Sequence, residues 1–156
     1  MAKAATPQNK TVFLSHSSDD DDLAAGAVQI LENHGGHVYL DHGDPNLSDS
    51  DCAAIAEELR NAIRRCKRFV MLATPRSKDS KWIPWELGLG DGVHNPTNVA
   101  IFPAAENSFD QDWAEREYLR LYRKIVWGRL EGYEDFLWLV LDMSANTAVK
   151  LADWLR

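Results

Sequence analysis

Residues Arg68–Thr74 read RFVMLAT, and Pro75 follows them. The apolar residues Phe69–Ala73 succeed one another without the polar–apolar alternation of a strand that has one face in water. Such a run predicts a strand buried on both faces, and proline ends it because it has no backbone N–H to donate. Strands of this kind are typical of parallel sheets covered by helices, so the stretch favours an α/β fold.

Similar apolar runs on both sides of this strand predict four more, at Thr11–Ser15, His37–Asp41, Asn98–Pro103 and Phe136–Asp142. Apolar residues at helical spacing predict the helices between and after them. Their ranges are 18–34, 52–66, 81–90, 112–126 and 147–155. We therefore predict a flavodoxin-like three-layer sandwich, with a five-stranded parallel sheet of order 2-1-3-4-5 and helices on both faces.

The predicted strand order also predicts the place of a binding site. In open α/β sheets, ligands bind beyond the carboxyl ends of the strands, where the order reverses. Here that point lies between the first and third strands. The loops Ser15–Asp19 and Pro75–Lys81 are therefore expected to line the site.

Length and composition limit the class of protein. The chain has 156 residues, of which 45% are apolar, which fits one globular domain at 11–156 after a flexible tail at 1–10. The 17 Lys and Arg against 24 Asp and Glu give a net charge of −7, so we expect no nucleic-acid partner. No apolar run is long enough for a membrane span or a signal peptide, so we expect a cytoplasmic protein without a membrane partner.

The cysteines and histidines predict neither a disulfide nor a metal site. Cys52 and Cys66 are 14 positions apart in one predicted helix. That spacing places them about 21 Å apart along the helix axis, too far to bridge. Both are expected to be buried thiols, and His34, His37 and His42 to be ordinary surface side chains. We expect no metal and no cofactor.

The helix after the second loop combines an aromatic residue with a carboxylate. Ser80–Gly88 reads SKWIPWELG, and Trp82 and Glu86 are four residues apart, so they share a helix face. Both are expected to point into the predicted crevice. A plainer interpretation is that Trp82 and Trp85 are core aromatics and Glu86 is a solvated helix acid.

The order and spacing of these segments resemble TIR (Toll/interleukin receptor) domains, most closely those of small bacterial proteins. The resemblance rests mainly on Ser77, Ser80–Trp82 and Trp85–Gly88, and it extends weakly through Tyr118–Tyr122 to the C-terminus. Earlier segments that contribute to it are Val12–Ser17, Val38–Asp41, Ile55–Lys67 and Phe69–Ala73.

The resemblance implies an enzyme that consumes NAD. Many bacterial and plant TIR domains cleave the nicotinamide N-glycosidic bond of NAD and release nicotinamide with ADP-ribose or a cyclic ADP-ribose isomer, in bacteria for antiphage defence signalling. It implies that Glu86 is the catalytic residue and that Trp82 lies beside the substrate, with Trp85 at a position that is often aromatic. NAD would be a substrate and not a cofactor.

Further substrate contacts are expected around the crevice. Because the pyrophosphate of NAD is anionic, the cations Arg76, Lys78 and Lys81 are candidates to bind it. The acidic run Asp19–Asp22 suits the dipole of the helix that it opens but would repel a phosphate there. The remaining candidate binding residues are Ser15, His16, Ser17, Asp41 and Ser77.

Other functions share parts of this pattern. A TIR domain can act as a non-catalytic adaptor that uses the loop His42–Ser50 for TIR–TIR contacts. Nucleoside deoxyribosyltransferases have a related sheet and a glutamate nucleophile. Phosphoacceptor receiver domains have an aspartate after the third strand and a lysine after the fifth, where this chain has Thr74 and Met143-Ser144.

The expected partners are a second copy of the chain and an effector or sensor protein. TIR–TIR contacts usually involve the loop after the second strand. In that loop this chain has Leu47–Asp51, without the glycine that many family members carry there.

Overall fold

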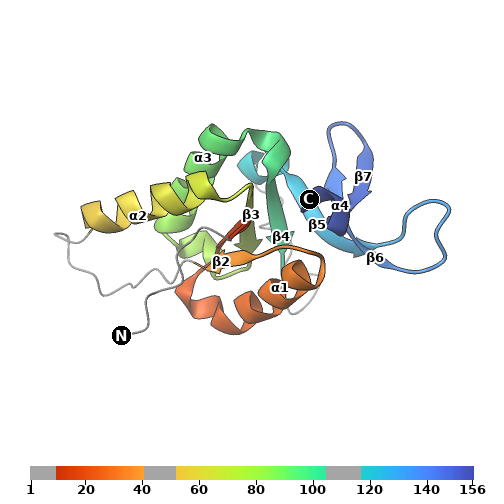
Figure 1. The fold of residues 1–156 in the computed structure, drawn as a ribbon, viewed down its shortest axis with the longest axis horizontal. Coiled ribbons are helices and arrows are strands. Elements are labelled where there is room, and N and C mark those ends of the chain that lie inside the picture. The colour runs from red at the N-terminus through yellow and green to blue at the C-terminus, as the bar shows by residue number, and fades with distance from the viewer. Residues whose placement is uncertain (1–9, 41–51, 105–116) are drawn as a thin grey trace.

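The computed structural model describes residues 10–40, 52–104 and 117–156. Their strands form one sheet of order β2-β1-β3-β4-β5-β6-β7 (Figure 1). The strands are β1 Val12–Ser15, β2 Val38–Leu40, β3 Arg68–Ala73, β4 Val99–Pro103, β5 Arg123–Gly128, β6 Leu137–Asp142 and β7 Thr147–Lys150. The α-helices are α1 Asp21–Asn33, α2 Cys52–Arg65, α3 Trp82–His94 and α4 Leu151–Trp154.

Helices cover both faces of the sheet. Strand residues alternate between the faces, so Val12 and Leu14 pack with α1 and α4, whereas Phe13 packs with α2 and α3. Figure 1 shows α1 on one side of β1 and β3, and α2 with α3 on the other. This is the predicted three-layer arrangement.

The parallel part of the sheet matches the prediction closely. β1 pairs with β2 and with β3, β3 pairs with β4, and β4 pairs with β5, all in parallel. The α/β class and a flavodoxin-like sheet that begins 2-1-3-4-5 are therefore confirmed. Ser15 lies beside Met71 in the register, so β1 and β3 end together and the loops after them are neighbours.

The C-terminal third differs from the prediction of five parallel strands, because the described residues form a seven-stranded sheet in which β6 and β7 pair antiparallel. The helix predicted over Asp112–Val126 is wrong within the described residues, where a short 3-10 helix, Glu117–Leu121, leads into strand β5. The segment predicted as the fifth parallel strand is β6, which runs antiparallel to β5. The helix predicted over Thr147–Leu155 divides into strand β7 and the short helix α4.

The physical reason is that spacing alone did not separate helix from strand here. Ile125, Val126 and Trp127 are β-branched or aromatic and prefer a pleated surface. Trp127 pairs with Trp138 across β5 and β6, at 5.4 Å between ring centroids. Leu121, which the helical pattern placed on the apolar face, is 70% exposed.

No helix in the described ranges is both long and apolar enough to cross a membrane. Cys66 is a buried thiol, as predicted, whereas Cys52 is only half-buried, which differs from the prediction. The tail at 1–9, Asp41 and the loop to residue 51 lie outside the described residues.

Candidate active site

A cleft of about 360 Å³ opens beyond the carboxyl ends of β1 and β3. One wall comes from residues after β1 and the other from the loop after β3 with the start of α3. These are the two loops that the strand order selected. The lining residues are His16, Ser17, Ser18, Asp19, Arg76, Asp79, Ser80, Lys81, Trp82 and Glu86.

Glu86 lies in the second turn of α3 and is 1% exposed, although it lines the cleft. Its helix is fixed at the start because Ser80 Oγ accepts a hydrogen bond from the Ile83 amide at 3.3 Å. Ile83 and Leu87, on either side of it along the chain, are core residues. The carboxylate therefore sits in surroundings that hold little water, where its electrostatic effect on a bound molecule is strengthened.

Trp82 forms part of the cleft wall, and Trp85 supports it from behind. The two rings meet edge to face, with centroids 5.5 Å apart and planes at 84°. The Arg60 guanidinium lies 5.6 Å from the centre of the Trp85 ring. Both tryptophans also pack against the core, and of the two only Trp82 is among the lining residues.

The wall formed by the residues after β1 is held by polar contacts between residues close in sequence, just before and at the start of α1. The His16 side chain is 2% exposed, and its Nε2 lies 3.2 Å from Asp21 Oδ1. Ser17 Oγ accepts a hydrogen bond from the Asp19 amide at 3.4 Å. Ser15 is fully buried in β1 and does not line the cleft.

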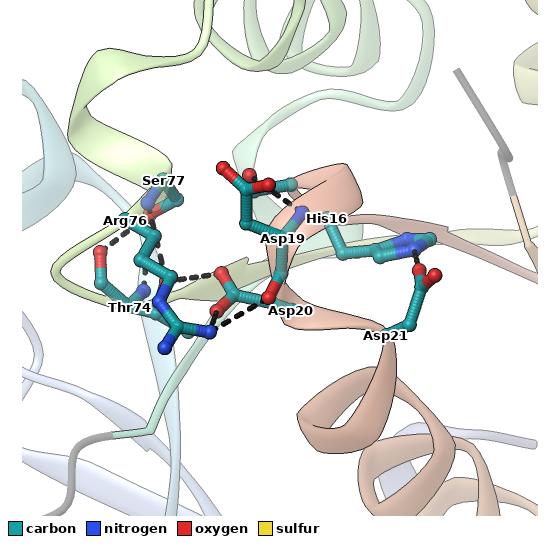
Figure 2. Close-up of polar contacts among 8 residues, drawn as sticks. His16, Asp19, Asp20, Asp21, Thr74, Arg76 and Ser77 are labelled. Carbon is teal, nitrogen blue, oxygen red and sulfur yellow. Dashed lines mark hydrogen bonds and ion pairs between the residues drawn. The ribbon is translucent and has the colours of Figure 1, made fainter. Parts of the chain in front are cut away.

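Asp20 connects the residues of the two walls through contacts with Thr74 and Arg76 (Figure 2). It is 2% exposed, and its Oδ2 accepts a hydrogen bond from the Thr74 hydroxyl. Its Oδ1 lies 3.7 Å from Arg76 Nη1, which also donates to the Asp19 carbonyl at 2.7 Å. The sequence pattern does not single out Asp20 or Thr74 as site residues. The only signal was the acidic run at 19–22, which does not show which of its members is buried.

Ser77 shapes the second loop and does not line the cleft. Its hydroxyl donates to the Thr74 carbonyl at 2.8 Å and accepts from the Thr74 amide at 3.0 Å. These bonds close the turn that follows β3. The predicted contact between Ser77 and the substrate has no support in the structure, because Ser77 is 2% exposed and does not reach the cleft.

The cleft carries charges of both signs. Arg76 and Lys81 supply cations, and Asp19, Asp79 and Glu86 supply carboxylates. The predicted phosphate ligand Lys78 belongs to the 3-10 helix Ser77–Asp79, but its side chain is outside the described ones, as is the whole of Asp41. The described residues contain no cluster of side chains suited to a metal ion.

Residues 12–137 match the TIR domain family. The chain belongs to this family. A relative of this TIR domain is the probable 3′ cyclic ADP-D-ribose synthase ThsB′ of Bacillus cereus (strain MSX-D12). It is 32% identical over 148 residues, which are 93% of this chain and 75% of the relative. The structure of a 2-deoxyribosyltransferase from Bacillus psychrosaccharolyticus superposes with a TM-score of 0.49 at 15% identity, over 72% of this chain and 96% of that chain.

Two of the segments that resemble TIR domains in the sequence meet at the cleft. The residues after β1 form one wall, and the helix with Trp82 and Glu86 forms the other. Among the candidate binding residues, this TIR domain brings His16, Ser17, Arg76 and Lys81 into the lining, whereas Ser15, Ser77 and Trp85 stay behind it.

Proposed function

We propose that this TIR domain cleaves the bond between nicotinamide and ribose in NAD, with Glu86 as the catalytic residue. The observation that carries the proposal is a glutamate 1% exposed that nevertheless lines an open cleft beside Trp82. The Bacillus cereus relative, a probable cyclic ADP-D-ribose synthase, supports the same class of reaction. The proposed products are nicotinamide with ADP-ribose or a cyclic isomer, and the proposed role of the reaction is antiphage defence signalling.

The reaction needs one well-placed carboxylate. When the C1′–N bond breaks, its electron pair moves to the nicotinamide ring, which leaves as a neutral molecule without needing a proton. Positive charge develops on C1′ and the ring oxygen of the ribose, as in glycosidase transition states. The Glu86 carboxylate stabilises that charge, and water or a nucleophile of ADP-ribose itself then attacks C1′ and loses a proton.

Trp82 suits the departing ring. An aromatic face attracts a cation by about 0.5–2 kcal/mol, so it binds the cationic nicotinamide of NAD more strongly than the neutral product. The ring is half-buried and braced by Trp85. It also covers part of the cleft near Glu86, which keeps water from the reacting bond.

The proposed ligands of the NAD pyrophosphate are Lys81 and Arg76. Lys81 is exposed at the start of α3 and lines the cleft. Arg76 uses Nη1 for Asp19 and Asp20, and the guanidinium has further N–H donors for a phosphate oxygen. Asp19 lies on the opposite wall and disfavours a phosphate there.

The proposal extends to the whole protein. Residues 11–156 act as one domain, in the cytoplasm, and self-associate through TIR–TIR contacts, with an effector or sensor protein as a further partner. Self-association is the proposed means of control.

Product analysis tests the proposed reaction. Concentrated protein is incubated with NAD and, in a separate reaction, with 2′-deoxyadenosine plus a second free base. The products are separated by chromatography and identified by mass spectrometry. We expect nicotinamide and an ADP-ribose product from NAD, and no base exchange. Base exchange would instead identify a deoxyribosyltransferase, and no reaction with either substrate would favour the adaptor.

A further inference from the structure

We propose that Asp20 is a positioning residue, which fixes the spacing of the two cleft walls through Thr74 and Arg76. The inference rests on the proposed cleavage of NAD. It gives one member of the acidic run a specific task, although Asp20 itself does not line the cleft.

The first step is that Asp20 and Thr74 form a buried contact between distant parts of the chain. They are 54 residues apart in sequence, and their exposed fractions are 2% and 0%. A carboxylate is costly to bury unless hydrogen bonds and opposite charge compensate it. Thr74 supplies the hydrogen bond, and Arg76 supplies the charge at 3.7 Å.

The second step is that this contact joins residues adjacent to both walls. Asp19, next to Asp20, lines the first wall, and Arg76, two residues after Thr74, lines the second. The hydrogen bonds between Ser77 and Thr74 close the turn after β3. A shift of Thr74 would therefore also shift Arg76 and the rest of this turn. Figure 2 shows Arg76 extending from the second wall to both Asp19 and Asp20.

The third step is that the same carboxylate holds a cleft cation. The Arg76 side chain is 62% exposed, so packing alone does not fix it. Its position depends on Asp20 Oδ1 and on the Asp19 carbonyl. Loss of the Asp20 charge therefore removes the ion pair and leaves only the Asp19 carbonyl to hold the guanidinium that is proposed to bind pyrophosphate.

The test compares variants that keep shape but change the contact. Thr74→Val removes the hydroxyl, Thr74→Ser retains it, and Asp20→Asn removes the charge. We expect Thr74→Val and Asp20→Asn to lower kcat/KM for NAD by roughly 10- to 100-fold with a rise in KM, because small misplacements of substrate-binding groups have effects of that order. Thr74→Ser should stay within about threefold of the wild type.

The control is Val140→Ala, a core truncation on β6 away from the cleft. All variants are assayed below their melting temperatures, measured by circular dichroism. Partial unfolding lowers the apparent kcat but leaves KM unchanged. A raised KM therefore indicates a positioning effect and not a loss of stability.

A double variant Asp20→Asn/Thr74→Val should lose little more activity than the more impaired single variant, since both substitutions disturb the contact between Asp20 and Thr74.

Three outcomes would overturn the inference while leaving the NAD reaction in place. They are unchanged KM in Asp20→Asn and Thr74→Val, failure of Thr74→Ser to restore activity, or an equal rise of KM in Val140→Ala. A wild-type protein that releases no nicotinamide would instead refute the proposed function, and the inference with it.

Discussion

Glu86 combines near-complete burial with a place on the wall of an open cleft. A solvated helix acid would be largely exposed, so the plainer interpretation of Glu86 is wrong at 1% exposure. A carboxylate in this position loses hydration and gains effect on any charge that develops beside it. Trp82 lies one turn earlier on the same helix face, so one helix carries both the proposed ring-binding residue and the proposed catalytic carboxylate.

Replacing Trp82 by alanine should weaken NAD binding. Loss of a cation–π contact of about 0.5–2 kcal/mol corresponds to a rise in KM of roughly 2- to 30-fold. Trp82→Phe, which keeps an aromatic face, should show a smaller rise. Steady-state kinetics of nicotinamide release measure both variants, and an unchanged KM in Trp82→Ala would remove this residue from the site.

Cys66 should react slowly with thiol reagents. Burial raises the pKa of the Cys66 thiol to about 11. At pH 8 the reactive thiolate is then about one part in a thousand, and it increases as the pH rises towards the pKa. Half-buried Cys52 is the internal comparison. Mass spectrometry after iodoacetamide treatment of the folded protein should find Cys52 modified first, and equal rates would contradict the burial of Cys66.

Helix α3 reaches the sheet closely because it carries a glycine at the contact. A Cβ placed on Gly90 would lie 2.7 Å from the ring of Phe69, which is fully buried in β3. This approach sets the height of α3 above the sheet. Glu86 lies four residues earlier on the same face of that helix, so the glycine also helps to place the carboxylate.

Gly90→Ala should destabilise the fold by about 1–3 kcal/mol, as overpacking of a core does. The matched control is Gly92→Ala in the same helix, where a Cβ meets nothing within 4 Å. That substitution should stabilise the protein by about 0.5–1 kcal/mol, because alanine favours helix more than glycine. Urea unfolding measures both, and equal effects would contradict the described packing of α3.

The turn between β6 and β7 should show a pH dependence set by Asp142. Hydrogen bonds from Ser144 and Ala145 hold the pKa of the Asp142 carboxyl below its ordinary value, with a smaller contribution from Arg123. A depressed pKa stabilises the fold above the ordinary value of 3.8, and this stabilisation is lost as pH falls through the lowered pKa. The stability difference between wild type and Asp142→Asn should therefore shrink from about pH 6 to about pH 2 in urea unfolding. A constant difference would contradict these contacts.

The elements also show what the sequence can predict and what it cannot. Unbroken apolar runs identified β1, β3 and β4, and the strand order then located both cleft walls. The run from Arg123 was misassigned because its helical spacing was equally compatible with a strand, and pairing with β4 and β6 decided between them. Asp20 could not be selected because its partner Thr74 is 54 residues away, and only the folded chain brings them together.

At the scale of the whole molecule, the sheet has two unlike parts. The parallel part carries the cleft, and the antiparallel strands β5, β6 and β7 extend from it at the other end (Figure 1). In this antiparallel part, Trp127 and Phe136 are 57% and 55% exposed, and their rings stack with centroids 6.2 Å apart. The site is therefore built entirely from the part whose order the sequence predicted.

If self-association controls the enzyme, activity and molecular mass should rise together with protein concentration. Size-exclusion chromatography with light scattering gives the mass, and nicotinamide release per molecule gives the activity at each concentration. We expect low specific activity in dilute samples, because assembly is a mass-action equilibrium. A monomer that is fully active at every concentration would contradict the proposed control.

Nicotinamide release by wild type and by Glu86→Gln decides whether Glu86 acts in the cleavage of NAD. Glutamine keeps the shape of the side chain and removes its charge, and a matched melting temperature shows that the fold is kept. We expect release by the wild type and a loss of at least about 100-fold in the variant, the order found when one electrostatic contact to a transition state is removed. Equal release by both proteins would contradict the assignment of Glu86.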